Sequence, residues 1–288
     1  MLDFDHHLKS RIPAFSTHPE LREIFDYALR PPGKLFRPRL LEALCQDLKI
    51  SHERDILTLG CAIEIHHAYS LVHDDLPAMD NDLIRRGKPS THAKYGEWKA
   101  LLIGDALLAQ SYRELDRLQT PQKDFIRQFF LWATAGGGLI LGQWIDLSGL
   151  ADKTAARLRM HELKTSRLMQ IAIIGGMALK SSMSFGDLKS GLRLGAAIGI
   201  AFQLLDDLDD LNAPSEHELK VNPFILNARE ATSALEKNLV LIESSSYPQL
   251  KKFLTAFLDK SFANLKTSRG WTQHFTQDDL KKIESLYQ

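Results

Sequence analysis

The sequence predicts an all-α protein with a single domain, and three observations support this. Its longest apolar stretches have a helical period, as in 62–72 and 194–205. Of the 288 residues, 44% are hydrophobic, which is enough for a sizeable core. The sequence contains no internal repeat and no low-complexity linker that would separate domains. We therefore expect one helical domain over residues 1–288.

The predicted helices are bounded by proline, glycine and polar residues. Pro31 and Pro32 end the first helix, and Pro38 can start the second. Within the fifth helix, the triplet Gly136–Gly138 predicts a kink or close packing, because no Gly-Lys-Ser/Thr follows it as in a phosphate loop. In chain order the predicted helices are 19–29, 39–48, 56–72, 99–118, 125–145, 154–179 and the run 194–205, with three more in the C-terminal part, 227–288.

The charge balance and the cysteines exclude several classes of protein. The formal net charge is zero with 25% charged residues, so nothing predicts binding to nucleic acid or to an anionic membrane surface. Residues 1–11 lack the apolar core of a signal peptide, and the apolar run 171–179 is too short to span a membrane. Cys45 and Cys61 are predicted to be core residues without a disulfide. We expect a cytoplasmic protein without membrane insertion.

The segment 71–87 carries the most unusual charge pattern. Four aspartates fall within the nine residues 74–82, at the end of an apolar helical run, and Arg85 and Arg86 follow. Crowded carboxylates repel one another unless a cation holds them, and Mg²⁺ binds through one or two carboxylates plus substrate phosphates. Arginine grips phosphate oxygens in pairs. The alternative is a solvated acidic helix end. Because Pro77 prevents a regular helix, we expect a bulge that brings Asp80 back beside Asp74.

A second acidic cluster ends another apolar helical run, at 206–210. Asp206 and Asp210 are spaced i, i+4, so one helical face presents both carboxylates, and Asp209 lies near them at i+3. One aspartate patch is common, but two at the ends of buried helices favour a shared role. We expect the two clusters to hold metal-bridged phosphate between them, above an apolar cavity.

These motifs resemble those of the trans-isoprenyl diphosphate synthases, most closely the bacterial farnesyl diphosphate synthase type. The segment 74–87 is similar to the family's first aspartate-rich motif in its longer form, and 202–210 is similar to the second. Smaller motifs stand in the family's order at 33–38, 104–108, 142–147 and 161–165. The resemblance covers about residues 30–212 and implies an isoprenoid-synthase-type helical bundle around a deep central cavity.

The resemblance also implies a homodimeric prenyltransferase that joins isopentenyl diphosphate, head to tail, to dimethylallyl and then geranyl diphosphate, giving farnesyl diphosphate. Mg²⁺, with three ions expected when substrate is bound, would be held by Asp74, Asp80, Asp206 and Asp210. The groups expected to stabilise the departing diphosphate are Arg85, Lys164 and Lys220. Those expected to present oxygens to the developing carbocation are Thr165 and Gln203. Those expected to position isopentenyl diphosphate are Lys34, Arg37, His67 and Arg86.

Product length is expected to depend on Tyr69 and Ser70, which precede Asp74 by five and four residues. Each helical turn is about 5.4 Å long, comparable to one isoprene unit, so a side chain one or two turns before the metal site sets the floor of a tail cavity. In similar bacterial enzymes an aromatic residue at this place goes with a C15 product. Tyr69 therefore favours farnesyl diphosphate.

The sequence departs from the family pattern at two places that matter. The family usually has arginine where Leu35 or Phe36 stands, so one phosphate donor is expected to be absent. The segment 211–224 is about ten residues shorter than usual and contains only Lys220, where relatives carry two Gly-Lys pairs. These departures leave open a degenerate, non-catalytic subunit that binds diphosphates. A class I terpene cyclase is the other alternative, although cyclases normally carry an Asn/Ser/Glu triad at the second site.

Overall fold

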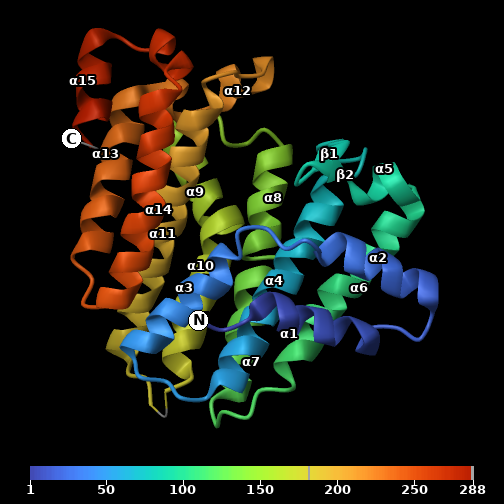
Figure 1. The fold of residues 1–288 in the computed structure, drawn as a ribbon. Coiled ribbons are helices and arrows are strands. Elements are labelled where there is room, and N and C mark those ends of the chain that lie inside the picture. Colours follow the sequence, from blue (N-terminus) through green and yellow to red (C-terminus); the bar gives the residue numbers. More distant parts are fainter. Residues whose placement is uncertain (181, 287–288) are drawn as a thin grey trace. The chain divides into compact units, whose positions relative to one another are not determined.

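Helices make up most of the computed structural model, which describes residues 1–180 and 182–286 (Figure 1). The chain divides into two compact units, the first comprising Met1–Leu131 with Gly175–Met183 and the second Trp132–Ile174 with Ser184–Gln288. The all-α prediction is confirmed. The single domain over residues 1–288 and the central cavity stay predictions.

The first unit is built around helix α4, which packs against α3 and α6. Its elements are α1 (Phe4–Arg11), the 3₁₀ turn η1 (Ile12–Ala14), α2 (Pro19–Leu29), α3 (Phe36–Asp47), α4 (Glu53–Asp74), β1 (Ile84–Arg85), β2 (Lys88–Pro89), α5 (Thr91–Tyr95) and α6 (Glu97–Leu115). Helix α2 has the bounds that were predicted from the sequence, 19–29. Helices α3 and α4 each begin three residues before their predicted first residues. Both cysteines are buried and free, as expected.

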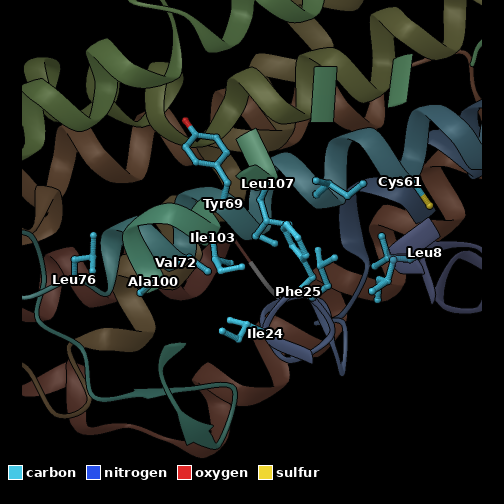
Figure 2. Close-up of a cluster of buried hydrophobic side chains, with 14 residues drawn as sticks. Leu8, Ile24, Phe25, Cys61, Tyr69, Val72, Leu76, Ala100, Ile103 and Leu107 are labelled. Atoms are coloured by element: carbon cyan, nitrogen blue, oxygen red, sulfur yellow. The ribbon is translucent and has the colours of Figure 1, made fainter. Parts of the chain in front are cut away.

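One apolar cluster fills this unit where α4 meets α2 and α6 (Figure 2). Tyr69 and Val72 of α4 lie in it with Ile103 and Leu107 of α6. The two helices also approach closely at Gly104, because a Cβ atom there would lie 2.0 Å from Nε2 of His73. The small residue of the Gly104-Asp105 motif thus lets α6 pack on the end of α4 that carries the first acidic motif.

A two-stranded antiparallel hairpin follows that motif, and the helical reading did not predict it. Ile84 pairs with Pro89 and Arg85 with Lys88, so Arg86 and Gly87 form a two-residue turn. Both have positive φ, 54° and 74°, as a type I′ hairpin turn requires. The Arg85-Arg86-Gly87 sequence is therefore also a turn signal, which fixes where the two guanidinium groups are presented.

The second unit is built around α11, with α13 and α14 running beside it (Figure 1). Its elements are α8 (Leu139–Leu147), α9 (Thr154–His161), the π-helical turn η2 (Glu162–Ser166), α11 (Phe185–Asp210), α12 (Glu216–Val221), α13 (Pro223–Glu243), α14 (Pro248–Thr267), the 3₁₀ turn η3 (Gly270–His274) and α15 (Gln277–Ser285). Helices α7 (Lys123–Thr134) and α10 (Arg167–Ala178) each contribute residues to both units. The three C-terminal helices predicted from sequence are present.

The prediction of one helix over 125–145 is wrong, because α7 and α8 are separated at 135–138. Gly138 causes the break. It adopts φ −119° and ψ −120°, and a Cβ atom there would lie 1.9 Å from the carbonyl oxygen of Ala133. Only glycine fits such a position. The glycine triplet therefore ends one helix and begins the next instead of kinking a continuous one.

Among the residues that the structure describes, α11 is the one helix whose length and composition would allow it to cross a membrane. Half of its most apolar stretch is buried within the protein, as in the core helix of a globular unit. It also ends in four aspartates. The length and composition of α11 are therefore only weak evidence for a membrane span.

Candidate active site

The first acidic motif begins where α4 ends, at Asp74. The backbone amide of Asp80 donates to the carbonyl oxygen of Asp74 at 2.9 Å, and that of Asn81 donates to Leu76 at 3.1 Å. Asn81 takes the left-handed conformation that this return requires, with φ 56°. The predicted bulge is therefore confirmed for the backbone, and Pro77 lies within the loop that it closes.

Arg85 is held by two carboxylates of the same motif. Its Nε donates to Oδ1 of Asp75 at 2.9 Å, and its Nη2 donates to Oδ2 of Asp82 at 2.7 Å. Asp75 is buried, and burial raises the pKa of its carboxyl group despite the neighbouring guanidinium. Asp75 thus orients Arg85, whereas Asp74 is half-buried and Asp80 exposed.

Three of the four residues expected to position isopentenyl diphosphate lie together in the first unit. Burial, followed by the charges of Arg37 and Arg86, lowers the pKa of His67 well below its ordinary value. Burial also lowers the pKa of Arg37 to about 10, although the nearby Glu64 opposes the shift. Nη2 of Arg86 lies 3.5 Å from Oε1 of Glu64. A neutral histidine near two guanidinium groups is a suitable cradle for an anion.

Gly33, the glycine of the motif at 33–38, lies close to one guanidinium group of this cradle. A Cβ atom at Gly33 would lie 3.2 Å from the guanidinium group of Arg86, whose Nη1 donates to the carbonyl oxygen of Pro31 at 3.3 Å. Lys34, the fourth expected residue, is exposed. Leu35 caps α3 in the left-handed conformation with φ 49°.

Tyr69 and Ser70 occupy different surroundings on α4. Tyr69 is 6% exposed and lies at one edge of the apolar cluster in Figure 2, with its ring edge-on to His66 and His73 at 4.5 and 5.8 Å. Burial raises the pKa of its hydroxyl group. Ser70 is half-buried, and its hydroxyl donates to the carbonyl oxygen of His67 at 2.9 Å. Tyr69 is therefore the fixed, bulky member of the pair.

In the second unit, α11 ends in the second acidic motif. Asp206, Asp209 and Asp210 are exposed, whereas Asp207 is buried. Although the Asp210 side chain reaches solvent, the surrounding protein partly desolvates its carboxyl group, and this desolvation, followed by the charge of Asp206, raises the pKa of Asp210 to about 7. A divalent cation between these carboxylates would relieve this repulsion.

The motif at 161–165 forms the π-helical turn η2, which α8 and α11 approach closely. A Cβ atom at Gly142 of α8 would lie 2.4 Å from the backbone nitrogen of Lys164, and one at Gly199 of α11 would lie 2.3 Å from Oγ of Ser166. Single π turns in α-helices are frequent at functional sites. The glycine of the 142–147 motif is therefore explained by packing against η2.

Lys164 is oriented by the same helix α8. Its Nζ donates to Oδ2 of Asp146 at 2.7 Å, while Arg157 donates to the other carboxylate oxygen at 2.9 Å. Burial opposes ionisation, but the charges of Lys164 and Arg157 prevail and lower the pKa of Asp146. Asp146 thus holds the lysine in place.

Thr165 and Gln203 are brought together, as expected. The Thr165 hydroxyl donates to Oε1 of Gln203 at 3.0 Å, and Nε2 of Gln203 donates to Oδ1 of Asp207 at 3.2 Å. Oδ2 of Asp207 lies 3.0 Å from Nε2 of His161. No role for His161 or Asp207 was predicted from the sequence. The one sequence feature that could have indicated a role for His161 is its spacing from Lys164 and Thr165, since all three lie within about one helical turn.

Lys220 lies on the short helix α12, in the segment expected to be shortened. Ser215 and Glu218 form a capping box at its start, and Lys220 is exposed. Asn222 then begins α13, and its Nδ2 donates to the carbonyl oxygen of Asp207 at 2.6 Å. The segment after the second motif is therefore tied to that motif through Asn222.

Across residues 1–180 and 182–286, no three His, Cys, Asp or Glu side chains are grouped as a preformed metal site. Mg²⁺ takes oxygen ligands, is bound by one or two carboxylates and completes its shell with water and substrate phosphates. Asp74 with Asp80, and Asp206 with Asp210, provide oxygen donors of this kind, and a cation beside Asp210 would favour the charged form that burial and Asp206 disfavour.

The helical fold and these motifs are typical of synthases that bind diphosphate substrates. Comparison with known proteins identifies the family. Residues 18–222 match the polyprenyl synthetase family, so the chain belongs to the trans-isoprenyl diphosphate synthases.

Its relatives include enzymes with different products. A geranylgeranyl diphosphate synthase of Cyanophora paradoxa is 41% identical over 66% of this chain and 65% of its own length. A farnesyl diphosphate synthase of Bacillus subtilis is 34% identical over 68% of both chains. A farnesyl diphosphate synthase of Micrococcus luteus is 33% identical over 87% of this chain and 85% of its own.

Solved structures agree with the fold. A geranyltransferase of Legionella pneumophila matches 90% of this chain and 95% of its own, with a TM-score of 0.79 and 28% identity. A geranyltransferase of Helicobacter pylori, complexed with magnesium and isoprenyl diphosphate, matches 90% of this chain and 97% of its own, with a TM-score of 0.71 and 27% identity. The family assignment and the isoprenyl-synthase fold are therefore shown.

Proposed function

We propose that this protein is a Mg²⁺-dependent prenyltransferase that condenses isopentenyl diphosphate with dimethylallyl and then geranyl diphosphate, giving farnesyl diphosphate and releasing diphosphate. The observation that carries the proposal is the tip of α11, where Asp206 and Asp210 lie one helical turn apart and where burial, followed by the charge of Asp206, raises the pKa of Asp210 to about 7. Such a carboxylate group suits a divalent cation that carries diphosphate. The neighbour complexed with magnesium and isoprenyl diphosphate supports the same ligands.

In this proposal Asp74, Asp80, Asp206 and Asp210 hold Mg²⁺, with three ions when substrate is bound. The metal, when bound, supplies positive charge that neutralises the diphosphate leaving group. Arg85 and Lys164 add fixed positive charge to the same group, and each is already oriented by an aspartate of its own unit. Lys220 contributes from α12. Preorganised charge of this kind lowers the barrier to ionisation.

Lys34, Arg37, His67 and Arg86 are proposed to hold isopentenyl diphosphate so that its double bond meets the allylic carbon. Thr165 and Gln203 present oxygens to the cation that forms there. The carbon–oxygen bond to diphosphate breaks, the new carbon–carbon bond forms, and the departing diphosphate takes the final proton. Orientation of the second substrate contributes several kcal/mol, on the order of effects seen in oriented intramolecular reactions.

The C15 product is supported by Tyr69. A buried aromatic ring one turn and a half before Asp74 would stop the tail early, since each turn is about 5.4 Å. The relatives include both farnesyl and geranylgeranyl diphosphate synthases, so a C20 product is the competing outcome. Tyr69 and the half-buried Ser70 are the proposed determinants.

We also propose that the enzyme is a cytoplasmic homodimer. Exposed apolar side chains on one stripe of α6, Trp98, Leu101 and Leu102, support a protein interface on that helix. Light scattering in solution should give twice the mass of one chain. The mass of a single chain would contradict the dimer.

The test is product analysis of the purified protein with Mg²⁺, isopentenyl diphosphate and, in turn, dimethylallyl, geranyl and farnesyl diphosphate. The first two acceptors should yield farnesyl diphosphate, and the third should yield little. A hydrocarbon from farnesyl diphosphate alone would indicate a terpene cyclase. No turnover, combined with restored activity of a catalytic partner, would indicate the non-catalytic subunit that the short 211–224 segment and Leu35 suggest.

A further inference from the structure

The side-chain amide of Gln203 has only one orientation that fits its neighbours. A carboxylate oxygen accepts a hydrogen bond but does not donate one, so the end of the amide that faces Oδ1 of Asp207 must be the NH₂ group. The carbonyl oxygen then faces Thr165, 3.0 Å from its hydroxyl. Asp207 therefore decides which end of Gln203 is turned toward Thr165.

This orientation also determines what Thr165 can offer. Because the Gln203 oxygen accepts, the single hydroxyl hydrogen of Thr165 is used in that contact. The Thr165 oxygen can then present only lone pairs in other directions. If the amide were reversed, its NH₂ group would face Thr165, the hydroxyl would accept from it, and the hydrogen would point elsewhere. A lone pair stabilises a nearby cation, whereas a hydroxyl hydrogen opposes it.

Asp207 has buried polar neighbours on two sides. Nε2 of His161 lies 3.0 Å from its second carboxylate oxygen, although neither atom makes a hydrogen bond within the described residues. Nδ2 of Asn222 donates to the Asp207 backbone carbonyl at 2.6 Å. His161, Asp207 and Asn222 are all buried, at 5%, 9% and 5% exposure. His161 lies immediately before the π turn that carries Thr165, so the same segment positions both residues.

We infer that Asp207 and His161 are positioning residues that fix the Gln203 amide, so that Gln203 and Thr165 both present oxygen lone pairs to the allylic cation. The inference rests on the proposed prenyltransfer. It assigns the second aspartate of the 206–210 motif to orientation of the cation-facing oxygens instead of metal binding. It also gives the histidine of the 161–165 motif a function.

The kinetic test uses Asp207→Leu, which removes the acceptor for Gln203, with His161→Phe and the Gln203→Leu background, and Thr232→Ala as control. Thr232 is equally buried, but its hydroxyl donates within its own helix, to Ala228. Asp207→Leu and His161→Phe should each lower kcat by about tenfold or more, with KM for both substrates changed less than threefold, because removing one preorganised group costs about that much or more. Neither change should lower kcat further in Gln203→Leu. Thr232→Ala should keep the wild-type kcat.

Wild-type kcat in both variants, or equal losses with and without Gln203, would overturn the inference. Asp207→Leu keeps the branched shape of the side chain, so its fold is expected to persist, and His161→Gln, which keeps a polar group beside Asp207, should recover part of the activity.

A second readout does not need catalysis. Hydrogen exchange of the Gln203 side-chain NH₂ group, identified by its absence in Gln203→Leu, should be at least tenfold faster in Asp207→Leu than in the wild type. Unchanged exchange would refute the positioning role even if the protein transferred no prenyl group, whereas faster exchange in an inactive protein would instead reject the proposed function alone.

Discussion

At the scale of single residues, Asp210 makes the clearest prediction about pH. Its pKa rises from an ordinary 3.8 to about 7 in the fold, first through burial and then through Asp206. The folded state therefore binds a proton that the unfolded chain has released. In metal-free protein the free energy of unfolding should fall as pH rises from about 4 to 7.

Asp210→Asn should remove this dependence and raise the melting temperature above pH 7 in the absence of metal. The same substitution should abolish the stabilisation by Mg²⁺ with inorganic diphosphate, because one expected ligand is lost. Calorimetric melting at pH 5 and 8, with and without Mg²⁺ and diphosphate, measures both effects. A variant that melts like the wild type in all four conditions would contradict the assignment.

Tyr69 carries the prediction about product length. Tyr69→Ala removes a buried ring, so it should cost about 3–5 kcal/mol of stability and lengthen the main product by one or more isoprene units. Chain-length analysis of products made from geranyl diphosphate measures the change. Tyr95→Ala is the control, since this ring contacts Tyr27 near the surface of the same unit. An unchanged product length in Tyr69→Ala would contradict the proposal that Tyr69 forms the floor of the tail cavity.

At the scale of elements, the π turn η2 depends on two glycines. Gly142→Ala and Gly199→Ala would each force a Cβ atom to within 2.4 Å of η2, and overpacking of this kind costs about 1–3 kcal/mol. Each should also lower the transfer rate, because Lys164 and Thr165 would shift. Gly137→Ala is the matched control, since no atom lies within 4 Å of the added Cβ. Equal unfolding free energies for all three variants would contradict the close-packing account.

The elements also show what the sequence could predict. The helical spacing of the apolar residues predicted α4 and α11 and placed the acidic motifs at the ends of these helices. It could not predict the break at Gly138, because that break depends on a close approach to the Ala133 carbonyl. Nor could it predict the π turn, since the 154–179 pattern is compatible with one continuous helix. The 84–89 hairpin was missed because its strands have two residues each.

The same limit applies to the site. The sequence named Thr165 and Gln203 through the family resemblance, and the structure joins them. It could not show that Asp75 and Asp146 orient the two basic groups, because those pairings join residues 10 and 18 positions apart. Nor could it show the surroundings of Asp105 in the 104–108 motif, whose side chain is 61% exposed and lies 3.7 Å from His73.

At the scale of the whole molecule, each unit carries one acidic motif that we propose to bind metal. We expect the prenyl transfer reaction to require both motifs. The most direct test is the rate of diphosphate release from geranyl and isopentenyl diphosphate with Mg²⁺, in Asp74→Asn, Asp206→Asn and the control Asp209→Asn. Asp209 is exposed on the same helix end and accepts from Asn212. We expect a loss of about a hundredfold or more in each of the first two variants and little change in the third. Wild-type rates in either Asp74→Asn or Asp206→Asn would contradict the account.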